Sequence, residues 1–469
     1  MSALDALGRV HLVGVGGAGM SAIATLLAAR GLRVSGSDAA DGPALPALRA
    51  AGVDVHVGHD AALVDDVDTL VVSSAVRETN PELAAARARG LRVLHRSEAL
   101  AALMADRDAV AVAGAHGKTT TSAMVAVALI AAGADPSFAI GGTVLSDDGP
   151  LGGARDGSGP AFVAEADESD GSFLAYAPLV ALVTNVEPDH LDHYGSREAF
   201  EQAFVAFAGR VRRGGTLVAC ADDEGAARLV ADARADLEAR GVAVVTYGRS
   251  DAADVVLTDA ADGWSGTVRG LGASVGVDLA VPGAHNLLNA TGAWAACVCL
   301  GVDPVAAAAG LAAFRSTGRR FELRGSVAGV RVVDDYAHHP TEVAALLRAA
   351  RSVVGDGRVI ALFQPHLFSR TRTFAAEFGA AFDLADVVVV TDVYAAREDL
   401  DPQVTGALVV DRVPTPGKAR FVPDKREAAL AVAAVARPGD LVLTVGAGDV
   451  TELGAVILDA LGARGGDAA

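Results

Sequence analysis

The fold is decided by the stretch Gly114-Ala115-His116-Gly117-Lys118-Thr119-Thr120-Thr121, which follows an apolar run at residues 109–113 and precedes a helical pattern. Its glycines would let backbone N–H groups approach phosphate oxygens, and the amino terminus of the helix would favour negative charge. Lys118 would reach the β- and γ-phosphates, and a threonine hydroxyl would ligate magnesium. The general pattern G-x-x-x-x-G-K-[ST] starts at position 112, where Val112 stands, so we expect Gly114 to supply the turn. The stretch therefore predicts an α/β domain whose loop holds a nucleoside triphosphate.

The lysine of this loop is unusual for the chain. Only three lysines, Lys118, Lys418 and Lys425, stand among 39 basic residues. Arg offers a planar fork, whereas Lys is a compact point charge on a flexible stem. A chain that otherwise uses Arg has kept Lys where a point charge among phosphates is needed. This favours the phosphate-binding interpretation over an ordinary solvated turn.

Short Val-rich runs alternate with helical patterns rich in Ala, Leu and Arg, as at residues 10–15, 33–36 and 69–73. Such alternation is typical of βα units and predicts an α/β fold with mostly parallel sheets. Later runs at residues 161–164, 179–184 and 327–334 are expected to be strands of the same kind. Residues 147–160, rich in Gly, Asp and Pro, are expected to form an exposed loop.

The length of 469 residues suggests about three domains, at roughly 150 residues each. A polar interruption just before residue 109 and a looser break near residues 315–320 place the boundaries. We expect domains at residues 1–106, 107–319 and 320–469.

Composition excludes several classes of partner. The net charge of −19 would repel nucleic acid over most of the surface. No apolar run reaches the roughly 18 residues that span a bilayer, and no signal segment opens the chain, so a cytoplasmic protein without a membrane partner is expected. Cys220, Cys297 and Cys299 are expected to be buried free thiols.

An acidic run, Glu165-Ala166-Asp167-Glu168-Ser169-Asp170, follows one expected strand, and Asn185-Val186-Glu187-Pro188-Asp189-His190 follows the next. The acidic run alone could be a solvated loop. Because open α/β sheets place ligands at strand ends, and Mg²⁺ prefers hard oxygen ligands, the two segments together predict one shared cation site.

A second glycine motif opens the chain. Gly14-Val15-Gly16-Gly17-Ala18-Gly19 fits G-x-G-x-x-G, follows a strand and opens a helix, and Asp38 ends the next strand. Such a turn binds any diphosphate, so NAD and a UDP-sugar are both possible. A nicotinamide oxidoreductase is therefore one alternative, although it would leave the second phosphate loop unexplained. A nucleotide-regulated binding protein is another.

In their order along nearly the whole chain, these motifs resemble those of the Mur ligases, ATP-dependent amide-forming enzymes of bacterial cell-wall synthesis. The matching stretches are residues 11–21, 73–75, 80–82, 114–121, 165–170, 185–192, 285–286 with 289, 318–322, 334–342, 363–372 and 446–449.

The resemblance implies a Rossmann-like UDP-binding domain, a central P-loop ATPase domain with a mostly parallel sheet, and a Rossmann-like carboxy-terminal α/β domain that closes over both. It is nearest to the branch that joins L-alanine to UDP-N-acetylmuramate through an acyl phosphate, with ATP and two Mg²⁺ ions. The implied partners are these two substrates, for a monomer or homodimer. The nearest alternative within the family is the recycling branch, which joins a whole peptide to the same UDP-sugar.

The resemblance also implies roles for individual residues. The implied ATP contacts are Gly114, His116, Gly117, Lys118, Thr119, Thr120, Asn185, His285, Asn286, Asn289, Arg320 and Asp335. The implied UDP-sugar contacts are Gly16, Gly17, Ala18, Gly19, Met20, Ser21, Asp38, Ser73 and Ser74. The amino acid would meet Tyr336, His338, His366 and Arg370, the metals would meet Thr119, Glu165 and His190, and the catalytic set would be Lys118, His190, His338 and Arg370.

One departure from the wider family concerns the second metal. Many Mur ligases use a carbamylated lysine in the central domain, but no lysine lies between Lys118 and Lys418. His190, with a nearby acid or water, would have to serve instead, as in the alanine-adding branch.

Three of these assignments have plain structural alternatives. The pair His338-His339 could simply cap the helix expected from Thr341. Arg370 and Arg372 could both be solvated. Gly448-Asp449 could be only a turn.

Overall fold

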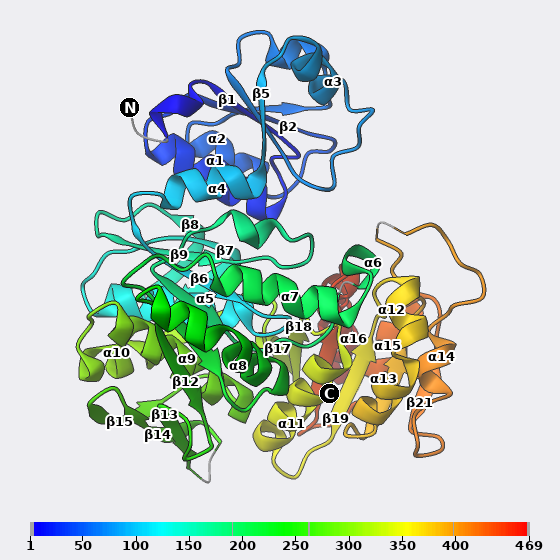
Figure 1. Cartoon of the computed structure of the whole chain (residues 1–469). Helices are drawn as coiled ribbons and strands as arrows, with labels where there is room; N and C mark the ends of the chain where they lie inside the picture. The colour runs from blue at the N-terminus through cyan, green and yellow to red at the C-terminus, as the bar shows by residue number, and fades with distance from the viewer. Residues whose placement is uncertain (1–3, 190, 261–262, 397, 467–469) are drawn as a thin grey trace. The chain divides into compact units, whose positions relative to one another are not determined.

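The computed structural model describes residues 4–189, 191–260, 263–396 and 398–466, which form two compact units (Figure 1). The first unit consists of the residues up to 259 together with 265–280 and 287–315, and it contains two sheets. The second consists mainly of the residues from 316 onward and contains one sheet. In the described residues no helix has the length and apolarity that crossing a membrane requires.

The first sheet has five parallel strands in the order β3-β2-β1-β4-β5. The strands are β1 (Val10–Val13), β2 (Val34–Asp38), β3 (Asp54–Val57), β4 (Thr69–Val72) and β5 (Arg92–His95). The helices and 3-10 turns of this part are η1 (Asp5–Leu7), α1 (Ala18–Ala29), α2 (Leu45–Ala50), η2 (Ala61–Val64), α3 (Pro81–Ala88) and α4 (Arg96–Met104). The strand order reverses between β1 and β4, which is where open parallel sheets bind ligands at their carboxyl ends.

The second sheet has eleven strands, and its centre runs parallel in the order β12-β11-β10-β6-β9-β7. The strands are β6 (Asp108–Ala113), β7 (Ser137–Ser146), β8 (Gly149–Arg155), β9 (Ala161–Glu165), β10 (Val180–Val183), β11 (Thr216–Cys220), β12 (Ala243–Gly248), β13 (Val255–Asp259), β14 (Ser265–Gly270), β15 (Ala273–Asp278) and β16 (Phe314–Thr317). The helices and the 3-10 turn are α5 (Lys118–Ala131), η3 (Ser172–Ala175), α6 (Leu191–Tyr194), α7 (Arg197–Ala208), α8 (Glu224–Ala239), α9 (Ala284–Cys299) and α10 (Pro304–Leu311). Strands β6 and β10 are buried along their apolar lengths, as central parallel strands must be.

The sheet of the second unit has six strands in the order β17-β18-β22-β19-β20-β21, and only β17 is antiparallel to its neighbour. The strands are β17 (Glu322–Val327), β18 (Val330–Asp335), β19 (Val359–Phe363), β20 (Val387–Val390), β21 (Ala419–Phe421) and β22 (Leu441–Val445). The helices and the 3-10 turn are α11 (Pro340–Val354), α12 (Phe368–Thr373), α13 (Ala375–Phe382), α14 (Ala407–Val410), α15 (Lys425–Val435), η4 (Asp449–Glu452) and α16 (Leu453–Gly466). Alternate strand residues pack on α11 and α13 on one face and on α15 and α16 on the other. The predicted α/β class with mostly parallel sheets is confirmed.

Residues 147–160 are not the exposed loop that their composition predicted. Strand β8 occupies half of this segment and pairs antiparallel with β7. A Cβ atom on Gly153 would lie 3.0 Å from the carbonyl oxygen of Ile140 on the facing strand. Here glycine allows two backbones to approach closely, and its presence marks a strand rather than a loop.

The strand expected at residues 327–334 is also different. It is divided into β17 and β18, which form a hairpin through Ala328 and Gly329. Both turn residues have positive φ angles, +49° and +75°, as two-residue hairpin turns of this kind require. The cysteines are free thiols as predicted; Cys220 and Cys297 are buried and Cys299 is partly exposed.

An aromatic cluster anchors the segment that follows the acidic run. Phe204 of α7 lies 5.3 Å from Phe173 and 5.1 Å from Phe200, measured between ring centroids, and all three are buried. We expect Phe204→Ala to lower the free energy of unfolding of the first unit by about 3–5 kcal/mol, because it leaves a cavity. Urea denaturation measures this. Val305→Ala, at a position that is 65% exposed, should stay within about 0.5 kcal/mol of wild type. A similar loss for both variants would contradict the prediction.

Candidate active site

The glycine-rich loop between β6 and α5 has the backbone geometry of a phosphate-binding turn. Gly114 has φ of +138° and Gly117 has φ of +80°. A Cβ atom on Gly114 would lie 2.1 Å from the hydroxyl of Thr184, and one on Gly117 would lie 2.9 Å from the Oδ1 atom of Asn289. Gly114 therefore supplies the turn, as expected with Val112 in the preceding strand.

Residues just after β10 hold this loop in place. The backbone N–H of His116 donates to Oδ1 of Asn185 over 3.0 Å, and Nδ2 of Asn185 donates to the carbonyl oxygen of His116 over 2.9 Å. The hydroxyl of Thr184 donates to the same carbonyl over 2.6 Å. Nε2 of His116 lies 3.3 Å from a carboxylate oxygen of Glu187. Asn185 thus acts on the backbone of the loop that was expected to hold phosphate.

Lys118, the first residue of α5, turns its ammonium back over the loop. Nζ donates to the carbonyl oxygens of Gly114 and Ala115, over 2.7 and 3.3 Å, and to a carboxylate oxygen of Glu168 over 2.9 Å. The side chain is only 15% exposed. Burial by itself lowers the pKa of Lys118, but the charges of Glu168 and nearby carboxylates outweigh burial and raise it. The ammonium is therefore firmly protonated.

The carboxyl group of Glu168 is buried beside that ammonium. Burial raises the pKa of Glu168 to about 7, although the charge of Lys118 acts in the opposite direction. The loop lysine is therefore hydrogen-bonded to a carboxyl group whose charged form is disfavoured by burial.

Oxygen atoms suitable for a cation meet at the start of α5. The hydroxyl of Thr119 donates to Oε1 of Glu165 over 3.1 Å, and the backbone N–H of Gly141 donates to Oε2 over 2.8 Å. A hydroxyl and a carboxylate beside a phosphate-binding loop are the donors that Mg²⁺ takes. His190, the predicted ligand of a second ion, lies outside the described residues.

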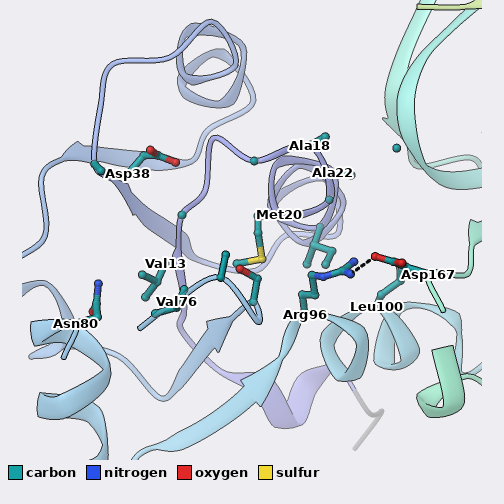
Figure 2. Close-up of a pocket in the computed structure, with 18 of the residues that line it drawn as sticks. Val13, Ala18, Met20, Ala22, Asp38, Val76, Asn80, Arg96, Leu100 and Asp167 are labelled. Carbon is teal, nitrogen blue, oxygen red and sulfur yellow. Dashed lines mark hydrogen bonds and ion pairs between the residues drawn. The ribbon is translucent and has the colours of Figure 1, made fainter. Parts of the chain in front are cut away.

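A cavity of about 810 Å³ lies at the carboxyl edge of the first sheet (Figure 2). Gly14, with φ of +77°, turns the chain after β1, and Oδ2 of Asp38 accepts the N–H of Gly16 over 2.9 Å. The predicted UDP-sugar contacts that line the cavity are Gly17, Ala18, Gly19, Met20, Asp38 and Ser73.

Three predicted contacts do not line this cavity but support its walls. Gly16 donates its N–H to Asp38, and the hydroxyl of Ser21 donates to the carbonyl oxygen of Ala18 over 3.0 Å. The hydroxyl of Ser74 donates to the carboxylate of Asp170.

The same cavity reaches the second sheet, because Ala139, Ile140, Gly141, Glu165 and Asp167 also line it. The cavity therefore extends from the amino terminus of α1 to the carboxylate of Glu165, which accepts the hydroxyl of Thr119. One continuous space joins the first glycine motif to the candidate cation site.

Sequence reasoning missed several residues of this cavity, among them His59, Arg77 and Arg96. His59 and Arg96 each follow a strand of the first sheet, β3 and β5, so position after a strand was the signal that could have found them. Figure 2 shows Arg96 pointing toward Asp167. A terminal nitrogen of Arg96 donates to Oδ2 of Asp167 over 2.6 Å.

His59 is oriented by a buried carboxylate. Its Nδ1 lies 3.1 Å from Oε1 of Glu82, whose other oxygen is 3.2 Å from Nε2 of His11 and accepts the hydroxyl of Ser37 over 2.7 Å. Burial works to raise the pKa of Glu82, but the hydrogen bonds from His11 and Ser37 bring about a net lowering. A charged Glu82 therefore fixes the Nδ1 side of the His59 ring.

In the second unit, the residues predicted to meet the amino acid surround the end of β18. The guanidinium groups of Arg319 and Arg320 lie 4.9 and 5.2 Å from the ring centroid of Tyr336. The ring of His338 lies 5.2 Å from that of Tyr336 and 6.0 Å from that of His366. Of the predicted residues, the structure brings Tyr336, His338 and His366 together.

Two titratable groups of this cluster are strongly shifted. Burial lowers the pKa of His338 to about 3, against the opposing charge of Glu342, so its ring is neutral at pH 7. Burial raises the pKa of Asp335 to about 6, against the charge of Arg320. The carboxylate of Asp335 accepts the backbone N–H groups of Phe321 and Ala337, over 2.7 and 2.8 Å, which gives it a role in holding this backbone.

The structural alternatives are now separated. Arg370 is buried, at 7% exposure, so the alternative that it is solvated is wrong. Arg372 is exposed and pairs with Asp401 on the surface, as the alternative predicts for a solvated arginine. His339 precedes α11, which begins at Pro340, and Glu342 accepts the backbone N–H groups of His338 and His339 over 2.9 and 3.3 Å.

Gly448 precedes the 3-10 turn η4, and Asp449 is more than a turn residue. Its Oδ1 accepts from Nε2 of Gln364 over 2.7 Å, and its Oδ2 accepts from Nζ of Lys425 over 2.5 Å.

Arg319 and Asp334 were missed by sequence reasoning. The Nε atom of Arg319 donates to the buried carboxylate of Asp334 over 3.1 Å, and a terminal nitrogen donates to the carbonyl oxygen of Gly446 over 2.6 Å. Arg319 adopts a positive φ of +60°. No local pattern distinguishes it from Arg320, so only the fold identifies it as the one that ties β18 to the loop after β22.

Three predicted nucleotide contacts, His285, Asn286 and Asn289, lie on α9. His285 and Asn289 are four residues apart and so share one face of this helix. Nδ2 of Asn286 donates to the carbonyl oxygen of Pro282 over 2.7 Å, an interaction that holds the start of the helix. Thr120 follows Thr119 in the first turn of α5.

Three family profiles match consecutive parts of the chain. The profile described as "Mur ligase family, catalytic domain" matches residues 9–108, "Mur ligase middle domain" matches 112–297, and "Mur ligase, glutamate ligase domain" matches 319–448.

Known proteins resemble the chain over its whole length. It is 64% identical to the UDP-N-acetylmuramate--L-alanine ligase of Kineococcus radiotolerans, over 98% of this chain and 97% of that protein. The solved UDP-N-acetylmuramate-alanine ligase of Thermotoga maritima superposes with a TM-score of 0.79 at 30% identity, covering 98% of this chain and all of that one. A murein peptide ligase from Psychrobacter arcticus superposes with a TM-score of 0.70 at 27% identity, covering 97% of this chain and 99% of that one.

The hold of Asn185 on the loop backbone can be tested. We expect Asn185→Ala to weaken the binding of a non-hydrolysable ATP analogue roughly 5- to 150-fold, because two hydrogen bonds to His116 are lost at about 0.5–1.5 kcal/mol each. Titration calorimetry measures the dissociation constant. Thr246→Ala removes a surface hydrogen bond to Asp254 and should leave the constant within about twofold of wild type. Equal constants for Asn185→Ala and wild type would refute this role.

Proposed function

Because this chain belongs to the Mur ligase family, we propose that it joins L-alanine to the carboxylate of UDP-N-acetylmuramate, converting ATP to ADP and phosphate. The observation that carries the proposal is the single cavity that runs from the amino terminus of α1 to Glu165, beside the loop of Lys118. A sugar nucleotide whose diphosphate lies at α1 would extend its carboxylate toward that loop.

The first sheet supplies the sugar-nucleotide half of the site. The N-terminal end of α1 favours a diphosphate, and Asp38 at the end of β2 is in position for a ribose hydroxyl. His59 follows the next strand along the sheet, β3, and also lines the cavity. Ser73 follows β4, on the other side of β1 in the sheet, and lines it as well.

The second sheet supplies the ATP half. Backbone N–H groups of the loop after β6 and the ammonium of Lys118 would hold the β- and γ-phosphates. Asn185 supports that loop through His116. The side chain of Asn289 lies against Gly117, since a Cβ atom there would be 2.9 Å from its Oδ1 atom.

The oxygen donors at Thr119 and Glu165 fit Mg²⁺ and would hold one ion, and His190 is proposed for a second. Such ions would neutralise charge on the transferring phosphoryl group. Lys118 contributes the same kind of stabilisation from the protein itself, since its ammonium is protonated at neutral pH.

A carboxylate does not condense with an amine unaided, because it is a poor electrophile. In the proposed reaction a carboxylate oxygen of the muramoyl group attacks the γ-phosphorus and ADP leaves, forming an acyl phosphate. The neutral amine of L-alanine then attacks the acyl carbon. The tetrahedral intermediate loses phosphate and a proton from nitrogen, and the amide remains.

The second unit supplies the amino-acid half of the proposed site. Arg370 is buried and presents a planar fork that would pair with the carboxylate of alanine. Nδ1 of His338 lies 3.0 Å from the carbonyl oxygen of Tyr336, so Nδ1 carries the proton and Nε2 accepts. A neutral ring with an accepting Nε2 would orient an attacking amine. His366 would complete this wall.

We further propose that the chain divides functionally at residues 1–106, 107–319 and 320–469, and that Arg320 and the α9 residues His285 and Asn286 contact ATP. A cytoplasmic monomer or homodimer without a nucleic-acid or membrane partner stays a prediction from composition and family.

Release of phosphate from ATP should require both UDP-N-acetylmuramate and L-alanine. We expect the tripeptide that the recycling branch would take to replace alanine poorly. Lys118→Ala should lower this release by about 10²-fold or more, because one preorganised charge at a reacting centre is typically worth that much. Phosphate release that is equally fast with tripeptide would favour the recycling reaction. Near-normal release by Lys118→Ala would contradict the role of the loop.

The fork of Arg370 makes a separate prediction. Arg370→Lys should raise the KM for alanine by roughly tenfold or more while the KM for ATP changes little, since lysine reproduces a bidentate pair poorly. Arg372→Lys is the matched control, because Arg372 lies two residues away, is exposed and pairs with Asp401. If the two variants have the same KM for alanine, Arg370 does not bind its carboxylate.

A further inference from the structure

The acidic link, defined as residues 165–170, connects the two halves of the first unit. On one side it meets the phosphate loop, through Glu165 to the hydroxyl of Thr119 and through Glu168 to the ammonium of Lys118. These two glutamates are three residues apart. Both contacts fall on groups expected to serve ATP.

On its other side the acidic link meets the first sheet. A terminal nitrogen of Arg96 donates to Oδ2 of Asp167 over 2.6 Å, and the hydroxyl of Ser74 donates to Asp170, which is also 3.6 Å from Nε2 of His95. The two aspartates are again three residues apart. The link therefore presents alternate carboxylates to two different ligand sites.

We propose that Glu168 and Asp167 are positioning residues that couple the two sites. Glu168 holds the Lys118 ammonium in the ligand-free protein, and the Arg96–Asp167 ion pair makes that hold respond to an anion in the cavity of the first sheet. The inference rests on the proposed function, since it takes the anion to be the diphosphate of the sugar nucleotide.

The hold on Lys118 must be broken before ATP binds fully. Glu168 is only 1% exposed and lies 2.9 Å from Nζ, where the phosphates would lie. A carboxylate there competes with phosphate for the ammonium and repels the triphosphate. The contact is therefore autoinhibitory in the empty protein.

Arg96 is placed to sense the other ligand. It lines the cavity, and its other terminal nitrogen, which does not donate to Asp167, lies 3.5 Å from where a Cβ atom of Gly19 would be, in the first turn of α1. That turn is an anion-binding helix terminus. A diphosphate bound there competes with Asp167 for the guanidinium.

Asp167 is a counter-ion of both cations. Burial works to raise its pKa, but Lys118 and Arg96 together lower the pKa of Asp167 to about 2. If a diphosphate takes over Arg96, Asp167 loses its ion pair on the side of the first sheet. Glu168 is the next residue, so its hold on Lys118 loosens as well. Sugar-nucleotide binding would thereby increase the affinity for ATP, although both ligands are anions.

The test is the coupling factor, which is the dissociation constant of the non-hydrolysable analogue AMP-PNP without the UDP-sugar divided by that with saturating UDP-N-acetylmuramate. Calorimetry on the full chain measures both constants. In wild type we expect a factor of roughly 5 or more, at the lower end of typical couplings. In Asp167→Asn it should fall to within about twofold of 1.

Glu168→Gln provides an independent measurement if Asp167→Asn folds poorly. Without the UDP-sugar it should bind AMP-PNP more tightly than wild type, by roughly the wild-type coupling factor, and the UDP-sugar should then add no more than about twofold. A purely structural role of Glu168 would weaken AMP-PNP binding instead.

Asp156→Asn is the matched control. Asp156 accepts from Nε of Arg30 over 2.9 Å, an ion pair that also joins the first sheet's helix α1 to the second sheet but does not involve the acidic link. Its coupling factor should equal that of wild type within about twofold.

A wild-type factor of 1 or less, equal factors in wild type and Asp167→Asn, or unchanged AMP-PNP affinity in Glu168→Gln would each overturn the coupling. These outcomes leave the proposed function standing. If the wild-type protein does not bind UDP-N-acetylmuramate at all, the proposed function fails, and the coupling that rests on it fails too.

Discussion

The buried ammonium of Lys118 needs carboxylates close by, and this requirement arranges the loops at the carboxyl edge of the second sheet. Strand β9 lies beside β6 in the parallel sheet, so the chain that leaves β9 passes over the loop that leaves β6. Glu165 and Glu168 are thereby placed on Thr119 and Lys118. The same carboxylates that stabilise the empty loop have to be accommodated when phosphates arrive.

The first sheet meets this arrangement through a second, partly buried charge. Arg96 follows β5 and reaches Asp167, so the acidic segment is held from both sides. Because Arg96, Asp167 and Glu165 all line the cavity that begins at α1, the first glycine motif and the candidate cation site share one space. The ion pairs Lys118–Glu168 and Arg96–Asp167 thus connect the acidic segment to both sheets of the first unit.

In the second unit, arginines lie beside buried carboxylates. Asp334 and Asp335 are buried at the end of β18, and the guanidinium groups of Arg319 and Arg320 both lie within 5.2 Å of the Tyr336 ring centroid. Burial keeps His338 neutral beside Glu342. A neutral imidazole and a buried guanidinium are suited to an amine and a carboxylate, the two ends of an amino acid.

The sequence by itself determined the α/β class, the two glycine turns and their helices, and the acidic run after β9, because each depends on local periodicity or on backbone conformations that only glycine adopts readily. It failed at residues 149–155, where glycines permit close strand pairing rather than a loop. Only the tertiary structure decided that Arg96 pairs with Asp167, 71 residues away, and that Arg319 rather than its neighbour pairs with Asp334. Such partners are chosen by which strand ends become adjacent in the sheet and by how burial forces each charge to find an opposite one, and neither is written in the residues around them.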